Sequence, residues 1–126
     1  MRIFKTRWFH RWARKESLSD EALIIAVKEM EQGLIDVDLG GNVYKKRVAL
    51  PGRGKSGSER IILAYRVEDK AFYVYGFAKN KRANIDDEEL KVLKAVSRDL
   101  LAHSDSELKR LVKEAELYEV MIDGRY

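Results

Sequence analysis

The amino-acid sequence predicts an α+β fold in which a small, twisted antiparallel sheet packs against N-terminal helices and a C-terminal helix. Three observations support this prediction. Apolar residues recur with the helical period of about 3.6 up to residue 33, the period falls to two over residues 43–78, and helical periodicity returns after residue 86. Strands that are grouped between helices, rather than alternating with them, are typical of an α+β fold.

The N-terminal part predicts one short strand followed by a helix. The strand covers residues 2–5, and the helix covers residues 7–15 with three aromatic side chains on one side, namely Trp8, Phe9 and Trp12. We interpret these aromatic side chains as core residues rather than as a platform on which nucleic-acid bases stack.

A second helix is predicted over residues 19–32. Ser17 or Ser19 can cap its N-terminus, and acidic residues occupy its first turn. Gly33 marks its C-terminal end. The apolar stripe of this helix consists of Leu23, Ala26, Val27 and Met30.

Three long strands are predicted in the middle of the chain. They cover residues 43–50, 59–67 and 71–78, where β-branched and aromatic residues follow a period of two. Because only three residues separate the second strand from the third, we expect these two to form an antiparallel hairpin. A Gly-rich connection that contains Pro51 joins the first strand to the second.

Two capping-box patterns predict helices in the C-terminal part. Asp86 with Glu89 starts one helix, and Ser104 with Glu107 starts the last one. After the last helix, residues 117–122 could form one more edge strand or could fray, and the sequence leaves both alternatives open.

Length and composition predict one domain, residues 1–126, with a core at about 1–102 and a C-terminal helical extension at about 104–126. No apolar run approaches the ~20 residues of a membrane span, and the N-terminus lacks the apolar stretch of a secretory signal. We therefore expect a cytoplasmic protein that contacts no membrane. Cysteine is absent, and His10 and His103 stand far apart, so we expect neither thiolate chemistry nor a metal site.

Residues 49–56, ALPGRGKS, match the relaxed pattern of a nucleotide-binding phosphate loop. Such a loop needs a helix directly after it, because the helix N-terminus takes part in phosphate binding. The residues after Ser56 follow the period of a strand instead. We therefore predict no nucleotide cofactor, nor any other, and interpret the segment as a turn that carries Arg53 and Lys55 into solvent.

Positive charge is concentrated in two parts of the chain, although the net charge is only +4. Residues 1–15, 16–39, 40–82 and 83–126 carry net charges of +6, −6, +8 and −4. Such a distribution is expected if one face contacts a polyanion, although solvated strands with exposed Lys and Arg would also produce it.

A phosphate-binding patch is predicted where basic residues of the strands come together. Lys45 and Arg47 lie on one face of their strand, and Arg60 lies near the start of the neighbouring strand. Arginine binds phosphate through two parallel N–H donors, and lysine adds a mobile charge. The segment after the third strand extends the patch with Lys79, Asn80, Lys81 and Arg82.

Two stretches of the chain, GRGKSGSERIILAYR and YGFAKNKRANI, resemble the RelE/HigB-type branch of the RelE/ParE superfamily of bacterial toxins. The resemblance extends from about Phe4 to Leu101. Members of this superfamily are toxins of type II toxin–antitoxin pairs, and the RelE type cleaves messenger RNA in the decoding site of the ribosome. The resemblance implies a metal-independent endoribonuclease, or mRNA interferase. The implied partners are the ribosome, mRNA and a cognate antitoxin, a helix-turn-helix protein from an adjacent gene.

The resemblance also implies roles for individual residues. The basic positions around the turn match Lys45, Arg47 and Arg60, and the second basic cluster matches Lys79 and Arg82; these five are the implied catalytic residues. The further RNA contacts that we expect are Lys46, Arg53, Lys55, Arg66, Asn80 and Lys81.

Two departures from the family pattern leave other functions open. Asn80 stands where RelE has an arginine, and Asp86 lies near the position of its stacking tyrosine. The chain could therefore be a catalytically silent partner of an antitoxin, and a ParE-like gyrase inhibitor would use the same scaffold. Cleavage would proceed by attack of a ribose 2′-hydroxyl on the adjacent phosphate, and the sequence does not choose the group that transfers the proton. The candidates are Lys45, Tyr73, Tyr75 and His10.

Overall fold

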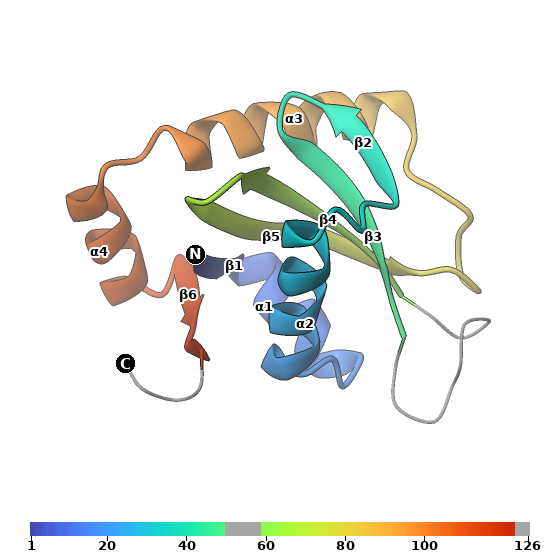
Figure 1. The fold of residues 1–126 in the computed structure, drawn as a ribbon, viewed down its shortest axis with the longest axis horizontal. Coiled ribbons are helices and arrows are strands. Elements are labelled where there is room, and N and C mark those ends of the chain that lie inside the picture. The colour runs from blue at the N-terminus through green and yellow to red at the C-terminus, as the bar shows by residue number, and fades with distance from the viewer. Residues whose placement is uncertain (50–58, 123–126) are drawn as a thin grey trace.

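The computed structural model describes residues 1–49 and 59–122, in which four helices pack on one six-stranded sheet (Figure 1). The strands lie in the order β2-β3-β4-β5-β1-β6, and the β1–β5 pair is parallel whereas the other pairs are antiparallel. This architecture confirms the predicted α+β class. In chain order, the elements are β1 (Arg2–Thr6), α1 (Arg7–Lys15), α2 (Asp20–Glu31), β2 (Val37–Gly40), β3 (Val43–Val48), β4 (Glu59–Arg66), β5 (Lys70–Ala78), α3 (Asp87–Leu101), α4 (Asp105–Lys113) and β6 (Leu117–Val120).

Side-chain caps start the helices where the sequence predicted them. Of the two candidates at α2, Ser19 is the cap, since its side chain accepts a hydrogen bond from the backbone N–H of Ala22 at 3.2 Å. Such caps satisfy N–H groups that have no partner within the helix. Both predicted capping boxes are present, formed by Asp86 with Glu89 at α3 and by Ser104 with Glu107 at α4.

No helix in the described part of the chain is both long and apolar enough to cross a membrane.

The central strands confirm the predicted antiparallel hairpin of β4 and β5, but the sheet is larger than predicted. β2, which the sequence analysis did not predict, pairs with β3 at one edge. β6 pairs with β1 at the other edge, so the residues after α4 form an edge strand rather than a frayed end. β3 ends at Val48, earlier than the predicted end at residue 50. The element after the Gly-rich segment is the strand β4, not the helix that a phosphate loop needs.

Both faces of the sheet are covered, by α1 and α2 on one face and by α3 on the other (Figure 1). Successive side chains of β4 enter two different cores. Ile61 and Leu63 pack with residues of α1 and α2, whereas Ile62 and Ala64 pack with residues of α3. The charged residues of β4, which are Glu59, Arg60 and Arg66, lie at its two ends, whereas Lys45, Lys46 and Arg47 lie within β3. The basic surface that the sequence predicted occupies one end of the sheet rather than a whole face.

A register shift in β5 changes which side chains face α3. Ile62 pairs with Tyr75 and Leu63 pairs with Tyr73, so Val74 is an extra residue in β5. A bulge of this kind interrupts the alternation of side chains along a strand. As a result, Val74 and Tyr75 both pack against the core on the α3 side of the sheet.

Candidate functional site

Three cations converge at one end of the sheet, around a depression of about 320 Å³ that we call the basic pocket. Lys45 and Arg47 come from β3, and Arg60 comes from the start of β4. Asp36, which precedes β2, and Val37, its first residue, complete the described lining. Arg47 and Arg60 occupy directly opposite positions in the β3–β4 ladder, so their side chains leave the same face of the sheet.

The electrostatics of the basic pocket favour an anion. Arg47 and Arg60 stand directly opposite each other in the ladder, and like charges in this arrangement repel, so an anion bound between them would reduce that repulsion. Asp36 is the only acidic residue among the described residues of the lining, and its carboxylate accepts a 2.7 Å hydrogen bond from the backbone N–H of Arg47. The Arg47 guanidinium makes no hydrogen bond or ion pair with the described residues, which leaves its N–H donors available to a phosphate.

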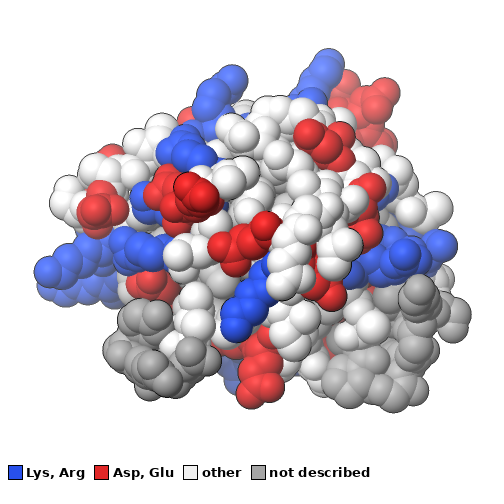
Figure 2. Space-filling view, in the orientation of Figure 1, with Lys and Arg blue, Asp and Glu red and all other residues white. Residues whose placement is uncertain are grey.

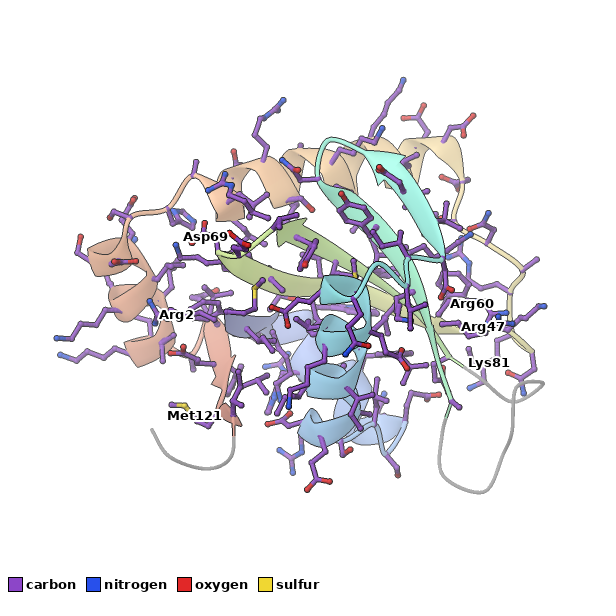
Figure 3. The ribbon with its side chains drawn as sticks, viewed as in Figure 1. Arg2, Arg47, Arg60, Asp69, Lys81 and Met121 are labelled. Carbon is purple, nitrogen blue, oxygen red and sulfur yellow. The ribbon has the colours of Figure 1, made fainter. Side chains whose placement is uncertain are left out.

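The turn after β5 adds cations beside the basic pocket. Lys79, Asn80 and Lys81 are all exposed in this turn. Figure 3 labels Lys81, Arg47 and Arg60 at the same end of the sheet, where the last residue of β5, Ala78, pairs with Glu59 at the start of β4. In the space-filling view, Lys and Arg gather along this right-hand edge of the molecule (Figure 2).

Arg82 uses all five of its N–H donors on protein acceptors. Its Nε and Nη2 donate to the carbonyl oxygen of Asn84 at 3.0 and 2.8 Å, and its Nη1 donates to the hydroxyl of Tyr75 at 3.3 Å. Nη1 and Nη2 also donate to the two carboxylate oxygens of Glu89, the first at 2.9 Å. Because a guanidinium has five N–H groups, a phosphate could bind only by displacing one of these acceptors. Arg82, implied as catalytic, therefore ties the loop before α3 to β5 and α3 in the structure.

Asn84 joins this network to the basic pocket, and sequence reasoning missed it. Its side-chain oxygen accepts a 3.1 Å hydrogen bond from Nζ of Lys45. No local pattern marks Asn84 or Asp36, because each meets its partner only after β3 has folded against a distant part of the chain. Glu89 did carry a signal, the capping box, but that signal predicts a helix start and not an ion pair with Arg82.

Lys46, a predicted RNA contact, lies on the opposite face of β3 from Lys45. Its side chain points toward α2, the residue is only 6% exposed, and its Nζ lies 2.8 Å from a carboxylate oxygen of Glu29. The cause is the period of the strand, which sends adjacent side chains to opposite faces. A buried and paired amine does not offer the exposed contact that the sequence predicted, and we correct that assignment.

Arg66 also lies away from the basic pocket. It ends β4, six residues after Arg60, which separates the two by roughly 20 Å at the rise of a strand. Its Nη1 lies 3.3 Å from a carboxylate oxygen of Asp69. The predicted RNA contact at Arg66 would therefore need a second surface. The predicted contacts at Arg53 and Lys55 lie outside the described residues.

The four candidates for proton transfer have very different surroundings. Tyr73 is buried, its hydroxyl donates to the carbonyl oxygen of Leu23 at 2.6 Å, and burial raises the pKa of Tyr73 far above its ordinary value. His10 stacks on Tyr118 of β6, at the far edge of the sheet, and burial lowers the pKa of His10. Neither can serve a reaction at the basic pocket. The candidates that lie in or beside the network of the basic pocket are Lys45 and Tyr75.

The ion pair of Glu89 with Arg82 should make the stability of the fold depend on pH. The side-chain hydrogen bonds from Arg82, followed by the backbone N–H of Asp86, lower the pKa of Glu89 from 4.5 to about 2. A carboxylate with a lowered pKa stabilises the folded state above its unfolded pKa, and the stabilisation is lost as the pH falls from about 4.5 to about 2. We expect the Glu89→Gln variant to lose part of this dependence, because glutamine keeps the capping box but not the charge.

Urea unfolding of the wild type and the variant, measured at several pH values between 5 and 2, tests this expectation. The difference between their midpoints should shrink as the pH falls. Glu88→Gln is the control, since it removes a neighbouring carboxylate that does not contact Arg82. A difference that stays constant across the range would contradict the assigned ion pair.

The comparisons with known proteins agree with this architecture. A family model described as the RelE toxin of the RelE / RelB toxin–antitoxin system matches residues 1–120, whereas a comparison with curated proteins gave no match. Among residues 1–49 and 59–122, no three His, Asp or Glu side chains gather so as to hold a metal ion. The family match spans nearly the whole chain, and the α+β sheet with its helices is consistent with it. The chain therefore belongs to the RelE family of toxins.

Proposed function

We propose that the chain is a ribosome-dependent mRNA endoribonuclease, of the RelE/HigB type, that acts in the cytoplasm as the toxin of a type II toxin–antitoxin pair. The observation that carries the proposal is the basic pocket. There Lys45, Arg47 and Arg60 converge, and Asp36 is the only acid in the described lining. A pocket that brings two opposed arginines and a lysine together is suited to a phosphate of an RNA backbone.

The proposed reaction is a transfer within the RNA at one phosphate. The ribose 2′ oxygen forms a bond to phosphorus while the bond from phosphorus to the 5′ oxygen of the next nucleotide breaks. The products are a 2′,3′-cyclic phosphate and a 5′-hydroxyl. A base takes the proton of the 2′-hydroxyl, and an acid gives a proton to the leaving oxygen. Arg47 and Arg60 would stabilise the negative charge that develops on the phosphate oxygens, which is commonly the largest contribution to such a reaction.

The proposal includes a cognate antitoxin, a helix-turn-helix protein encoded by an adjacent gene. By covering the basic pocket, this antitoxin would keep RNA from Lys45, Arg47 and Arg60. The complex would then be inactive until the antitoxin is removed. The order of the neighbouring genes offers an independent check of this part of the proposal.

Expression of the toxin alone tests the function. The chain is induced without its antitoxin, and the 5′ ends of cellular transcripts are mapped before and after induction. We expect growth to stop and new 5′-hydroxyl ends to accumulate at defined positions within codons. Normal growth without new ends would refute the endoribonuclease.

One observation favours a catalytically silent toxin as the second candidate, namely that the donors of Arg82 are already occupied. The same experiment separates the two, because a silent protein would bind its antitoxin tightly without producing new RNA ends. A supercoiling assay with purified gyrase covers the ParE-like alternative. Inhibition of supercoiling in the absence of RNA cleavage would assign the chain to that activity.

A further inference from the structure

A second depression, of about 430 Å³, lies between α1, β5 and α3, and we call it the aromatic pocket. Trp8 from α1, Val74 and Tyr75 from β5, and Val92 and Leu93 from α3 supply its apolar lining. The acids Glu88 and Glu89 complete its lining among the residues that the structure describes. A depression of this size, mostly apolar with a few polar groups at its rim, has the character of a small-molecule site.

Trp8 is the least expected part of this pocket. The sequence analysis placed it in the core, yet it is 47% exposed. Its ring stacks on the ring of Tyr75, with centroids 4.7 Å apart and an interplanar angle of 23°, and on the ring of Trp12, with centroids 6.2 Å apart. Trp12 in turn packs against Gly76, where any added Cβ would overlap its indole. The stack therefore holds Trp8 in a defined orientation although half of its surface is open to solvent.

The bulge in β5 builds the floor of the aromatic pocket. In a regular strand, Val74 and Tyr75 would point to opposite faces. Because Val74 is an extra residue in the register, both side chains face the α3 side and both line the pocket. Bulges are over-represented next to functional sites, where they redirect a side chain.

The aromatic pocket is connected to the basic pocket through Arg82 and Asn84. The hydroxyl of Tyr75, which lines the aromatic pocket, accepts from Arg82 at 3.3 Å. Arg82 donates to the carbonyl oxygen of Asn84, whose side chain accepts from Lys45 of the basic pocket at 3.1 Å. A ligand that fills both pockets would need a phosphate at one end and a flat apolar group at the other.

We propose that the aromatic pocket binds a nucleobase of the RNA strand whose phosphate occupies the basic pocket. This inference rests on the proposed function and adds a base-binding subsite to it. Single-stranded RNA is commonly bound by a cationic groove for its backbone together with aromatic side chains on which unpaired bases stack. The acids at the rim repel phosphate, so the two pockets sort backbone and base to opposite ends of the site.

Glu88 is the specificity-determining residue of this subsite. The carboxylate oxygens of Glu89 are engaged by Arg82, whereas one oxygen of Glu88 lies 3.8 Å from Nζ of Lys91, its nearest cation within residues 1–49 and 59–122. A carboxylate only accepts hydrogen bonds. It therefore favours a base with an exocyclic amino group, such as adenine, over uracil, whose single N3–H donor is flanked by two carbonyl oxygens that a carboxylate repels.

Binding of short single-stranded RNA to the full chain tests the subsite. The probes are a labelled hexa-adenylate, a hexa-uridylate and a ribose-phosphate hexamer without bases, and the measured quantity is each dissociation constant. For the wild type, we expect hexa-adenylate to bind about tenfold or more tightly than the abasic hexamer, which corresponds to stacking of one base. Trp8→Ala should remove most of this ratio, and Trp8→Phe should keep part of it.

Two matched controls isolate the effect. Val67→Ala shortens an exposed apolar side chain in the β4–β5 turn and should leave the ratio unchanged. Glu88→Gln should narrow the preference for adenylate over uridylate, whereas Asp87→Asn removes the same charge one residue earlier in α3 and should not. Urea midpoints of all variants identify any that fail to fold. If Trp8→Ala does not fold, the ratio measured for Trp8→Phe tests the role of Trp8.

Several results would overturn the inference. One such result is a Trp8→Ala variant in which the ratio of the dissociation constants for the abasic hexamer and hexa-adenylate is unchanged. Another is a Trp8→Ala variant that binds the antitoxin more weakly but binds RNA as the wild type does, because the pocket would then be a protein-docking groove. Failure of the proposed function looks different. In that case the wild type and an Arg47→Ala variant would bind the abasic hexamer with the same affinity. The basic pocket itself would then have no role in binding RNA.

Discussion

Alanine at Arg47 or at Arg60 is expected to lower the rate of RNA cleavage by about a hundred- to a thousandfold, the usual loss when one preorganised donor to a developing anion is removed. Both side chains leave the same face of the sheet at opposite positions in the β3–β4 ladder. Each loss should also reduce the dependence of RNA binding on salt, by about 0.7 in the log–log slope for one single-strand phosphate contact. Cleavage of mRNA on purified ribosomes measures the first effect, and salt titration measures the second.

The chain supplies matched controls for both substitutions. Arg66 lies on the same strand as Arg60 but at its other end, and Lys46 is the sequence neighbour of Arg47 on the opposite face of β3. Arg66→Ala and Lys46→Met should cleave RNA at nearly the wild-type rate. Equal losses in Arg60→Ala and Arg66→Ala would show that total charge, and not the basic pocket, determines activity.

Alanine at Phe72 is expected to lower the free energy of unfolding by about 3–5 kcal/mol, the cost of removing a buried aromatic side chain. Phe72 is fully buried on the α3 side of the sheet and stacks on Phe4, with ring centroids 5.0 Å apart. The two residues are partners in the parallel β1–β5 pair, so the substitution weakens the junction between the N-terminal strand and the hairpin. A loss of this size is a large part of the ~5–15 kcal/mol that stabilises a typical domain.

Urea unfolding followed by far-ultraviolet circular dichroism measures this loss. Val67→Ala is the control, because Val67 is 67% exposed and its truncation should change stability by less than about 0.5 kcal/mol. If the free energy of unfolding of Phe72→Ala changes by less than 1 kcal/mol, the burial of Phe72 in the core on the α3 side of the sheet would be contradicted.

Local signals in the sequence were sufficient for most of the secondary structure. The pairs Asp86 with Glu89 and Ser104 with Glu107 predicted two helix starts, and both capping boxes are present. These predictions succeed because a cap depends on residues only three positions apart. The alternation along β4 was equally reliable, since a period of two decides which residues share a face.

The features that the sequence could not predict depend on contacts between distant segments. The parallel pairing of β1 with β5 brings together residues nearly 70 positions apart, and no local pattern encodes it. The strand β2 is short, Val37–Gly40, and contains no run of β-branched residues. The register shift beside Val74 is likewise decided by pairing with β4. Each of these features positions a wall of one of the two pockets.

The candidate site was predicted in part for the same reason. Lys45, Arg47 and Arg60 were placed together because strand periodicity and the adjacency of β3 and β4 suffice for that conclusion. Arg82 was chosen for its charge and for its match to a basic cluster of the family, and the acceptors that occupy it became visible only when the loop before α3 had been placed against β5. Charge predicts that a residue can bind phosphate, whereas the structure decides whether its donors are available.

The most direct test of the basic pocket is the single-turnover cleavage of ribosome-bound mRNA by the Arg47→Ala/Arg60→Ala double variant, with Lys46→Met measured beside it. We predict that the wild type and Lys46→Met produce 5′-hydroxyl fragments at the same positions, and that the double variant, with a wild-type urea midpoint, produces none above background. Cleavage by the folded double variant at the wild-type rate would contradict the assignment of the basic pocket as the site of the reaction.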